Sequence, residues 1–218
     1  MPADGNAAVR NVVFDFGNVL IRWQPFKALN HIFDTEADMS ACLDEIGFFE
    51  WNAEQDRGRS WSDAVLWAER ECPEHAHVFR AYAEGLDAAH GERVPGTSEL
   101  VERLDACGVG LYGLTNAALA SFEAVRRTAP VIDRMRDVVI SAVEGLIKPD
   151  PAIFKICLDR NGLEAEETLF VDDSEANCRG AEAVGLAAHH FRSAEELERH
   201  LTDLGLLQAS PNHPTATA

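Results

Sequence analysis

The chain has little positive charge for its size. Its 218 residues include 19 Lys and Arg against 37 Asp and Glu, so the formal net charge is −18. Proteins that bind long nucleic acids or anionic membrane surfaces depend on clustered Lys and Arg. The composition therefore argues against both kinds of partner. A small anionic substrate would need a locally positive site, made by a metal ion or a few basic residues.

Long apolar runs and paired cysteine motifs are also missing. No window approaches the roughly 18 apolar residues of a membrane span, and the N-terminal residues lack the apolar segment of a signal peptide. No GxxxxGK motif occurs. Five cysteines occur without a CxxC pattern: Cys42, Cys72, Cys107, Cys157 and Cys178. This usage favours reduced thiols and predicts a cytoplasmic location.

What is present is an alternation of short apolar segments with amphipathic ones. Candidate strands cover residues 11–20, 109–114, 137–141, 168–171 and 187–191. Helical patterns follow the last four of them, within residues 117–127, 151–161, 174–184 and 193–204. Strands that alternate with helices predict an α/β fold, with a Rossmann-like, doubly wound parallel sheet.

A long helical block interrupts this alternation after the first strand. Residues 23–92 contain several short amphipathic helices, one of which begins at Ser60 with Asp63 at the capping-box position. We therefore expect a helical subdomain at 23–92, inserted in an α/β core made of residues 1–22 and 93–206. Residues 207–218 are rich in Ser, Pro, Thr and Ala, which predicts a disordered tail.

Polar residues stand where the apolar strands stop. Asp15 ends the first strand, Thr115 the second, and Asp172 and Asp173 the fourth, while Lys148 lies between the third and fourth strands. The carboxyl ends of parallel strands lie along one edge of a sheet, where ligands bind in such folds. The sequence therefore predicts that these side chains meet in one crevice.

Three carboxylates in one crevice need a cation. Like charges about 4 Å apart repel by several kcal/mol at a partly buried site. Oxygen ligands of this kind suit Mg²⁺, and Lys148 can screen Asp15 and an incoming anion. A carboxylate nucleophile with a metal ion and a lysine indicates phosphoryl transfer through an aspartyl-phosphate.

Four short motifs in this order resemble the haloacid dehalogenase-like (HAD) hydrolase superfamily, over about residues 11–205. They are Phe14-Asp15-Phe16-Gly17-Asn18-Val19, then Leu114-Thr115-Asn116, then Lys148-Pro149, and finally Val171-Asp172-Asp173 with Asn177. The helical block lies where that superfamily carries a C1-type cap. The resemblance implies a cap that closes over the site and selects a small phosphorylated metabolite.

The resemblance also assigns roles to individual residues. It implies that Asp15 is the nucleophile and that Mg²⁺ is held by Asp15, the Gly17 carbonyl and Asp173, with Asp172 acting through water. Thr115, Asn116 and Lys148 would contact the phosphate.

Gly17 departs from the family pattern. Phosphatases of this superfamily usually have an Asp two residues after the nucleophile, and its side chain protonates the leaving oxygen. General acid catalysis is typically worth about 10²–10⁴-fold, so the loss matters. Either the leaving group is good, or a neighbouring or cap residue supplies the proton, or the reaction is not phosphate hydrolysis. The Asp-x-Gly-Asn form is similar to bacterial sugar-phosphate phosphatases that act on glucose 1-phosphate.

Two other functions are weighed against a phosphatase. A 2-haloacid dehalogenase would use Asp15 to attack carbon without a metal, but the adjacent acids Asp172 and Asp173 would then be unneutralised. A non-catalytic binding protein with a degenerate site is the other alternative, and the retention of Asp15, Lys148 and both adjacent acids argues against it.

Basic residues near the helical block are candidates for substrate contact. Arg57 lies in a turn, residues 56–59, between two predicted helices, where a cap can present a loop to the core. We expect Arg57 to contact the substrate. Asp56 beside it is a candidate for the missing acid or for a helix cap, and Arg22 could face either the crevice or solvent.

Overall fold

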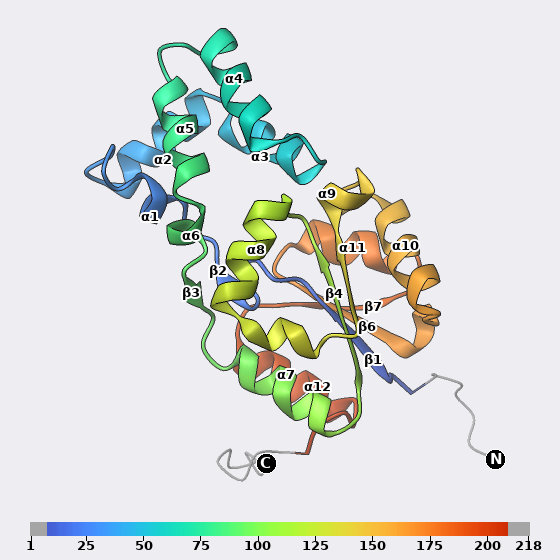
Figure 1. Ribbon diagram of the computed structural model, residues 1–218. Coiled ribbons are helices and arrows are strands. Elements are labelled where there is room, and N and C mark those ends of the chain that lie inside the picture. The colour runs from blue at the N-terminus through green and yellow to red at the C-terminus, as the bar shows by residue number, and fades with distance from the viewer. Residues whose placement is uncertain (1–7, 209–218) are drawn as a thin grey trace, which may run out of the picture.

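The computed structural model of the protein describes residues 8–208, and a five-stranded parallel sheet lies at its centre (Figure 1). Its strands are β1 (Asn11–Phe14), β4 (Gly110–Thr115), β5 (Asp137–Ile140), β6 (Thr168–Asp172) and β7 (Ala187–His190). The order across the sheet is β5-β4-β1-β6-β7. Strand β1 is central: Val13 pairs with Tyr112 of β4 on one side and Phe170 of β6 on the other. The predicted parallel α/β fold is confirmed.

Helices cover both faces of this sheet. One hydrophobic cluster joins one face to α7 (Thr97–Ala106), α8 (Leu119–Thr128), α12 (Ala194–Asp203) and the 3₁₀ helix η1 (Pro130–Arg134). A second cluster joins the opposite face to α10 (Pro151–Asn161) and α11 (Glu175–Glu182). The short α9 (Ser141–Glu144) follows β5, and the 3₁₀ helix η2 (Ala165–Glu167) precedes β6. Strands buried on both faces explain the continuous apolar runs in the sequence.

Six of the seven helices between β1 and β4 form a separate cluster, here called the helical module. They are α1 (Pro25–Leu29), α2 (Glu36–Glu45), α3 (Phe48–Asp56), α4 (Trp61–Glu71), α5 (Ala76–Glu84) and α6 (Leu86–Ala89). Their own core is aromatic: the Phe48 and Tyr82 rings are 4.8 Å apart, and those of Trp51 and Phe79 are 4.6 Å apart. Ser60 caps α4 by accepting from the Asp63 N–H, as the sequence predicts. The module lies beyond the carboxyl ends of the sheet strands (Figure 1).

A two-stranded antiparallel ribbon connects the module to the sheet domain. Strand β2 (Ile21–Arg22) leads into the module and β3 (Glu92–Arg93) leads out. The Glu92 carboxylate accepts from Lys27 Nζ at 2.5 Å and lies 3.3 Å from Arg22 Nε. Arg22 therefore belongs to this half-exposed ion-pair group on the ribbon.

Two boundaries differ from the sequence-based prediction. The first strand ends at Phe14 and not at residue 20, because Asn18 adopts φ 52° and the Phe16 carbonyl accepts from three N–H groups in a tight turn. Leu207, placed in the predicted tail, is buried in the cluster with α7 and α12. The rest of that tail, from residue 209, lies outside the described residues. None of the helices within residues 8–208 is long and apolar enough to cross a bilayer.

Candidate active site

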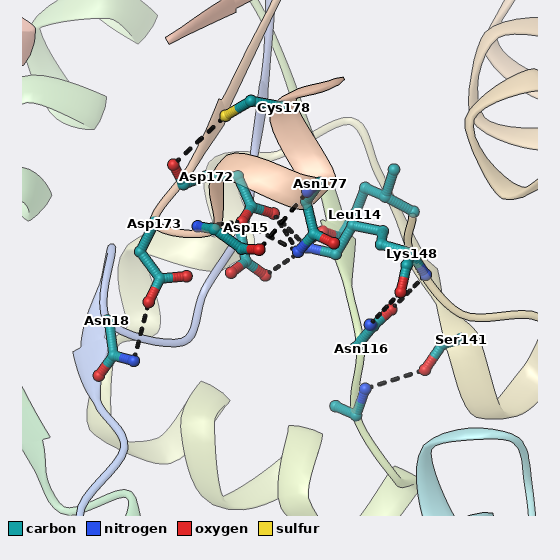
Figure 2. A network of polar contacts seen from close by, with 12 residues as sticks. Asp15, Asn18, Leu114, Asn116, Ser141, Lys148, Asp172, Asp173, Asn177 and Cys178 are labelled. Atoms are coloured by element: carbon teal, nitrogen blue, oxygen red, sulfur yellow. Dashed lines mark hydrogen bonds and ion pairs between the residues drawn. The ribbon is translucent and has the colours of Figure 1, made fainter. Parts of the chain in front are cut away.

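Lys148 is the centre of the polar network at the carboxyl edge of the sheet (Figure 2). Its Nζ donates to Asp172 Oδ2 at 2.7 Å and to the Leu114 carbonyl at 2.9 Å, and it lies 2.8 Å from Asp15 Oδ1. Lys148 is 3% exposed, and Asp15 is 7% exposed. An ammonium group has three N–H donors, so three acceptors satisfy the buried cation and fix its position beside Asp15.

Asp172 is the anchor of this lysine. Its Oδ1 accepts from the Ser174 N–H at 2.8 Å and from Asn177 Nδ2 at 3.0 Å. Its Oδ2 accepts from Lys148 and, at 3.2 Å, from Asn177 again. A carboxylate offers about four acceptor positions, and these contacts occupy them. These contacts make Asp172 a positioning residue for Lys148, and the water-mediated metal role that the family resemblance implies for Asp172 stays a prediction.

Asp173 is more accessible than Asp172 and points toward Asp15 (Figure 2). Its Oδ2 accepts from Asn18 Nδ2 at 3.0 Å, and its backbone carbonyl accepts from His190 Nε2 at 2.8 Å. Carboxylate oxygens of Asp15, Asp172 and Asp173 all lie within 4.8 Å of one another. The structure thus brings together the three acids that the sequence predicts to converge.

The charges in this cluster do not balance. Burial raises the pKa of Asp15, Lys148 lowers it, and Asp172 and Asp173 raise it again, with a net upward shift. Burial alone would lower the pKa of Lys148, but the charges of Asp15 and Asp172 outweigh it and raise that pKa. Burial and the neighbouring Asp172 also raise the pKa of Asp173 against the Asn18 hydrogen bond. Three carboxylates around one lysine, with two of them destabilised as anions, fit a bound divalent cation.

The residues that end and follow β4 lie at the same edge of the sheet. Thr115 ends β4, is buried and lines the cavity beside Asp15. The Asn116 side chain donates to the Lys148 carbonyl at 3.0 Å and accepts from the Lys148 N–H at 2.8 Å. Ser141 Oγ accepts from the Ala117 N–H at 2.9 Å and holds this turn (Figure 2). The side chain of Asn116 therefore positions the Lys148 backbone, which sequence reasoning missed, as it missed Ser141.

A cavity of about 320 Å³ opens in front of these groups, between the sheet edge and the helical module. Its sheet-side lining includes Asp15, Gly17, Lys148 and Asp173. Its module-side lining includes Trp23, Phe49, Asp56, Tyr82 and His90. The cavity is therefore charged and polar on one side and mainly aromatic on the other.

Of the two neighbouring residues Asp56 and Arg57, only Asp56 lines the cavity. Arg57 is exposed, its Nη1 pairs with Glu54 Oε1 at 2.9 Å, and the described cavity lining does not include it. Asp56 lines the cavity, where burial raises its pKa to about 6 against a backbone hydrogen bond from Ala118. The predicted substrate contact of Arg57 is therefore not seen. The acid beside it is the residue that reaches the site.

Gly17 lies at the cavity with open space around it. A Cβ atom built there meets nothing within 4 Å. The acid usually found at this place in the family is therefore absent without any steric reason.

This parallel α/β sheet presents a carboxylate cluster and a buried lysine at the carboxyl ends of its strands, where such folds bind their ligands. The sequence matches the haloacid dehalogenase-like hydrolase family over residues 9–185. The chain belongs to this family and is a hydrolase.

Known proteins extend this assignment. The sesquiterpene phosphatase astK of Aspergillus oryzae is 30% identical over 186 residues, covering 82% of this chain and 88% of that protein. A solved variant of the HAD family enzyme bt-2542 of Bacteroides thetaiotaomicron, in complex with magnesium and inorganic phosphate, has a TM-score of 0.71. It is 19% identical and covers 88% of this chain and 98% of its own.

The L-2-haloacid dehalogenase of Xanthobacter autotrophicus, solved with covalently bound chloropropionic acid, shares the fold. Its TM-score is 0.65 at 18% identity, with 89% of this chain and 83% of that chain covered. The fold therefore hosts both chemistries, and the site residues must decide between them.

Proposed function

We propose that the protein is a Mg²⁺-dependent phosphatase that hydrolyses a small phosphomonoester through an aspartyl-phosphate on Asp15. The observation that carries this proposal is the position of Asp15, 2.8 Å from the buried Lys148 ammonium and clustered with a more accessible carboxylate, Asp173. Asp15, the Gly17 carbonyl and Asp173 would hold the metal ion. When bound, it would supply positive charge to the phosphoryl oxygens.

Residues of the chain itself carry out the other parts of the reaction. Asp15 attacks phosphorus in line, and the bond from phosphorus to the leaving oxygen breaks. Lys148, fixed by three acceptors, stabilises the negative charge of the equatorial oxygens. The Thr115 hydroxyl donates to the same phosphoryl group. Water then cleaves the aspartyl-phosphate and restores Asp15.

The substrate class follows from the opposite wall. Trp23, Phe49 and Tyr82 line the cavity away from the carboxylates, and aromatic faces bind apolar or ring-shaped leaving groups. A sugar phosphate, implied by the sequence resemblance, and a terpenoid phosphate, suggested by the name of the Aspergillus relative, both present such a surface. We propose no nucleic-acid or membrane partner, in view of the net charge of −18. A cytoplasmic location is in keeping with five free thiols.

Dehalogenation is the less favoured alternative at this site. A metal-free attack on carbon next to a substrate carboxylate would leave Asp173 as an unneutralised anion beside Asp15. The phosphatase uses that same anion as a metal ligand.

The experiment is a panel of phosphate esters with Mg²⁺, run on wild-type protein and on Asp15→Asn. We expect turnover that EDTA abolishes and Mg²⁺ restores, and no turnover by Asp15→Asn with an unchanged circular dichroism spectrum. Asp133→Asn, which removes an exposed carboxylate paired with Arg126, is the matched control and should keep full activity.

Three results would contradict the proposal. The first is wild-type activity in Asp15→Asn. The second is EDTA-insensitive halide release from 2-chloropropionate, which would indicate a dehalogenase. The third is no turnover on any ester together with a stable protein partner in pull-down, which would indicate a binding protein.

A further inference from the structure

The proposed reaction needs a proton donor that β1 does not provide. An alkoxide is a poor leaving group, and a positioned acid typically accelerates its departure by about 10²–10⁴-fold. Gly17 has no side chain to supply that proton. The donor must therefore be another ionisable group that lines the cavity: Asp15, Asp56, Tyr82, His90, Lys148 or Asp173.

The sheet-side groups are already engaged. Asp15 is the proposed nucleophile, and Asp173 is the proposed metal ligand held by Asn18. Lys148 holds its three protons between Asp15, Asp172 and the Leu114 carbonyl. None of these can release a proton to the leaving oxygen without losing its own role.

Two groups on the module side, Tyr82 and His90, are unsuited to donate the proton. The Tyr82 hydroxyl accepts from Trp23 Nε1 at 2.8 Å, and burial raises its pKa further above neutrality. His90 Nδ1 lies 2.7 Å from the Leu86 carbonyl, which can only accept, so the neutral ring carries its proton there. Burial lowers the pKa of His90, so Nε2 has no proton to give.

Asp56 remains, and the backbone around it is shaped to bring it to the site. It ends α3, two residues before Gly58, which has φ +106°. A Cβ at Gly58 would lie 2.9 Å from the Ala142 carbonyl in α9, so only glycine allows this close approach. Figure 1 shows the end of α3 beside α9. The contact places Asp56 near the N-terminus of α8, where the Ala118 backbone hydrogen-bonds to it.

We propose that Asp56, supplied by the helical module, is the general acid and base that replaces the side chain missing at Gly17; this inference rests on the proposed phosphatase activity. As Asp15 Oδ bonds to phosphorus and the bond to the leaving oxygen breaks, the Asp56 carboxyl gives its proton to that oxygen. The Asp56 carboxylate then takes a proton from the attacking water. The new phosphorus–oxygen bond forms, the bond to Asp15 breaks, and both carboxyl groups return to their starting states.

The environment of Asp56 suits this work. Burial is the main cause that raises its pKa to about 6, opposed by the Ala118 backbone and by the charges of Arg57 and Lys148. An acid whose pKa lies near the working pH can be both a donor and an acceptor within one turnover.

Leaving-group dependence separates this role from a structural one. Asp56→Asn should lower kcat/KM for phenyl phosphate, whose phenoxide needs a proton, by about 100-fold or more. For 4-nitrophenyl phosphate, whose leaving group departs unprotonated, the loss should be less than about 10-fold. Glu54→Gln removes one carboxylate from the same helix, outside the cavity lining, and should change neither value.

A second variant makes the test independent of local damage. Gly17→Asp in the Asp56→Asn background places an acid where a Cβ has open space. It should raise kcat/KM for phenyl phosphate at least tenfold over Asp56→Asn and leave kcat/KM for 4-nitrophenyl phosphate nearly unchanged. An equal loss on both substrates in Asp56→Asn, without restoration by Gly17→Asp, would overturn the inference. Failure of the proposed function would show instead in the wild type or in Asp15→Asn.

Discussion

The cavity has a sheet-side wall and a module-side wall, here called the sheet wall and the module wall, and their charged groups lie in opposite kinds of environment. On the sheet wall, Lys148 and Asp172 are each surrounded by partners, and their hydrogen bonds fix the nucleophile Asp15. On the module wall, Asp56 lines the cavity together with aromatic side chains, and burial disfavours its charged form. Paired buried charges are costly to break, whereas an acid held in an unfavourable environment is costly to keep. Removing one charge should therefore have opposite effects on stability at the two walls.

The largest effect is expected from Lys148→Met on the sheet wall. It leaves the Asp15 and Asp172 carboxylates buried without their shared cation. Breaking such a buried pair typically costs about 3–5 kcal/mol, so we expect a loss of this size in the free energy of unfolding, measured by urea denaturation. Activity should fall at least about 10³-fold, since a buried charge that stabilises the transition state is lost.

An exposed ion pair on the module is the matched control. Arg80 pairs with Glu69 across α5 and α4, with both side chains well exposed. Arg80→Met should change the free energy of unfolding by less than about 1 kcal/mol and leave activity unchanged. Equal losses in the two variants would show that burial adds nothing to the contribution of the Lys148 ion pairs.

A smaller effect of opposite sign is expected from Asp56→Asn on the module wall. The folded pKa of Asp56, about 6, lies above its ordinary value of 3.8. Above pH 6 the native state therefore holds a charge that the unfolded chain holds more easily. The Asn variant should be more stable than the wild type by about 1–3 kcal/mol at pH 8.

The pH dependence of this gain checks its cause. As the pH falls through 6 toward 3.8, the wild-type carboxyl becomes protonated in the native state and the difference should disappear. Urea denaturation at pH 8 and pH 4 in EDTA measures the two values without a metal contribution. A stability gain that is equal at both values would mean that packing, and not charge, distinguishes the variant.

The polar residues of the sheet wall could be predicted because the sequence shows where each strand ends. Asp15, Thr115, Asp172 and Asp173 each follow a buried apolar run, and parallel strands bring their ends to one edge. What the sequence did not show was which hydrogen-bond partners each acid of the cluster has. The partners of Asp172 could not be predicted, because they depend on the turn after β6, where Ser174 and Asn177 fold back onto it.

The module wall could not be predicted to the residue. Arg57 and Asp56 are neighbours in the sequence, and on a helix successive residues point about 100° apart. Which of them reaches the cavity depends on how α3 is rotated against the sheet domain. That rotation is set by the approach of Gly58 to Ala142, two segments more than 80 positions apart. The sequence therefore indicated the correct turn and named both side chains as candidates, but favoured Arg57 over Asp56.

The smallest effect is expected from Phe49→Ala, which tests whether the module wall selects the leaving group. Phe49 lines the cavity with about half of its surface exposed and packs edge-on against Trp23, with ring centroids 6.1 Å apart. An aromatic contact of this kind contributes about 0.5–1.5 kcal/mol. We therefore expect KM to rise up to about tenfold for esters with large apolar or ring-shaped leaving groups. KM for acetyl phosphate, whose leaving group is too small to reach that wall, should stay unchanged, as should kcat.

Leu66→Ala removes a similarly exposed apolar side chain from α4, outside the cavity lining, and should leave every KM unchanged. A uniform rise in KM for all esters would place Phe49 at the phosphate end and remove the distinction between the two walls.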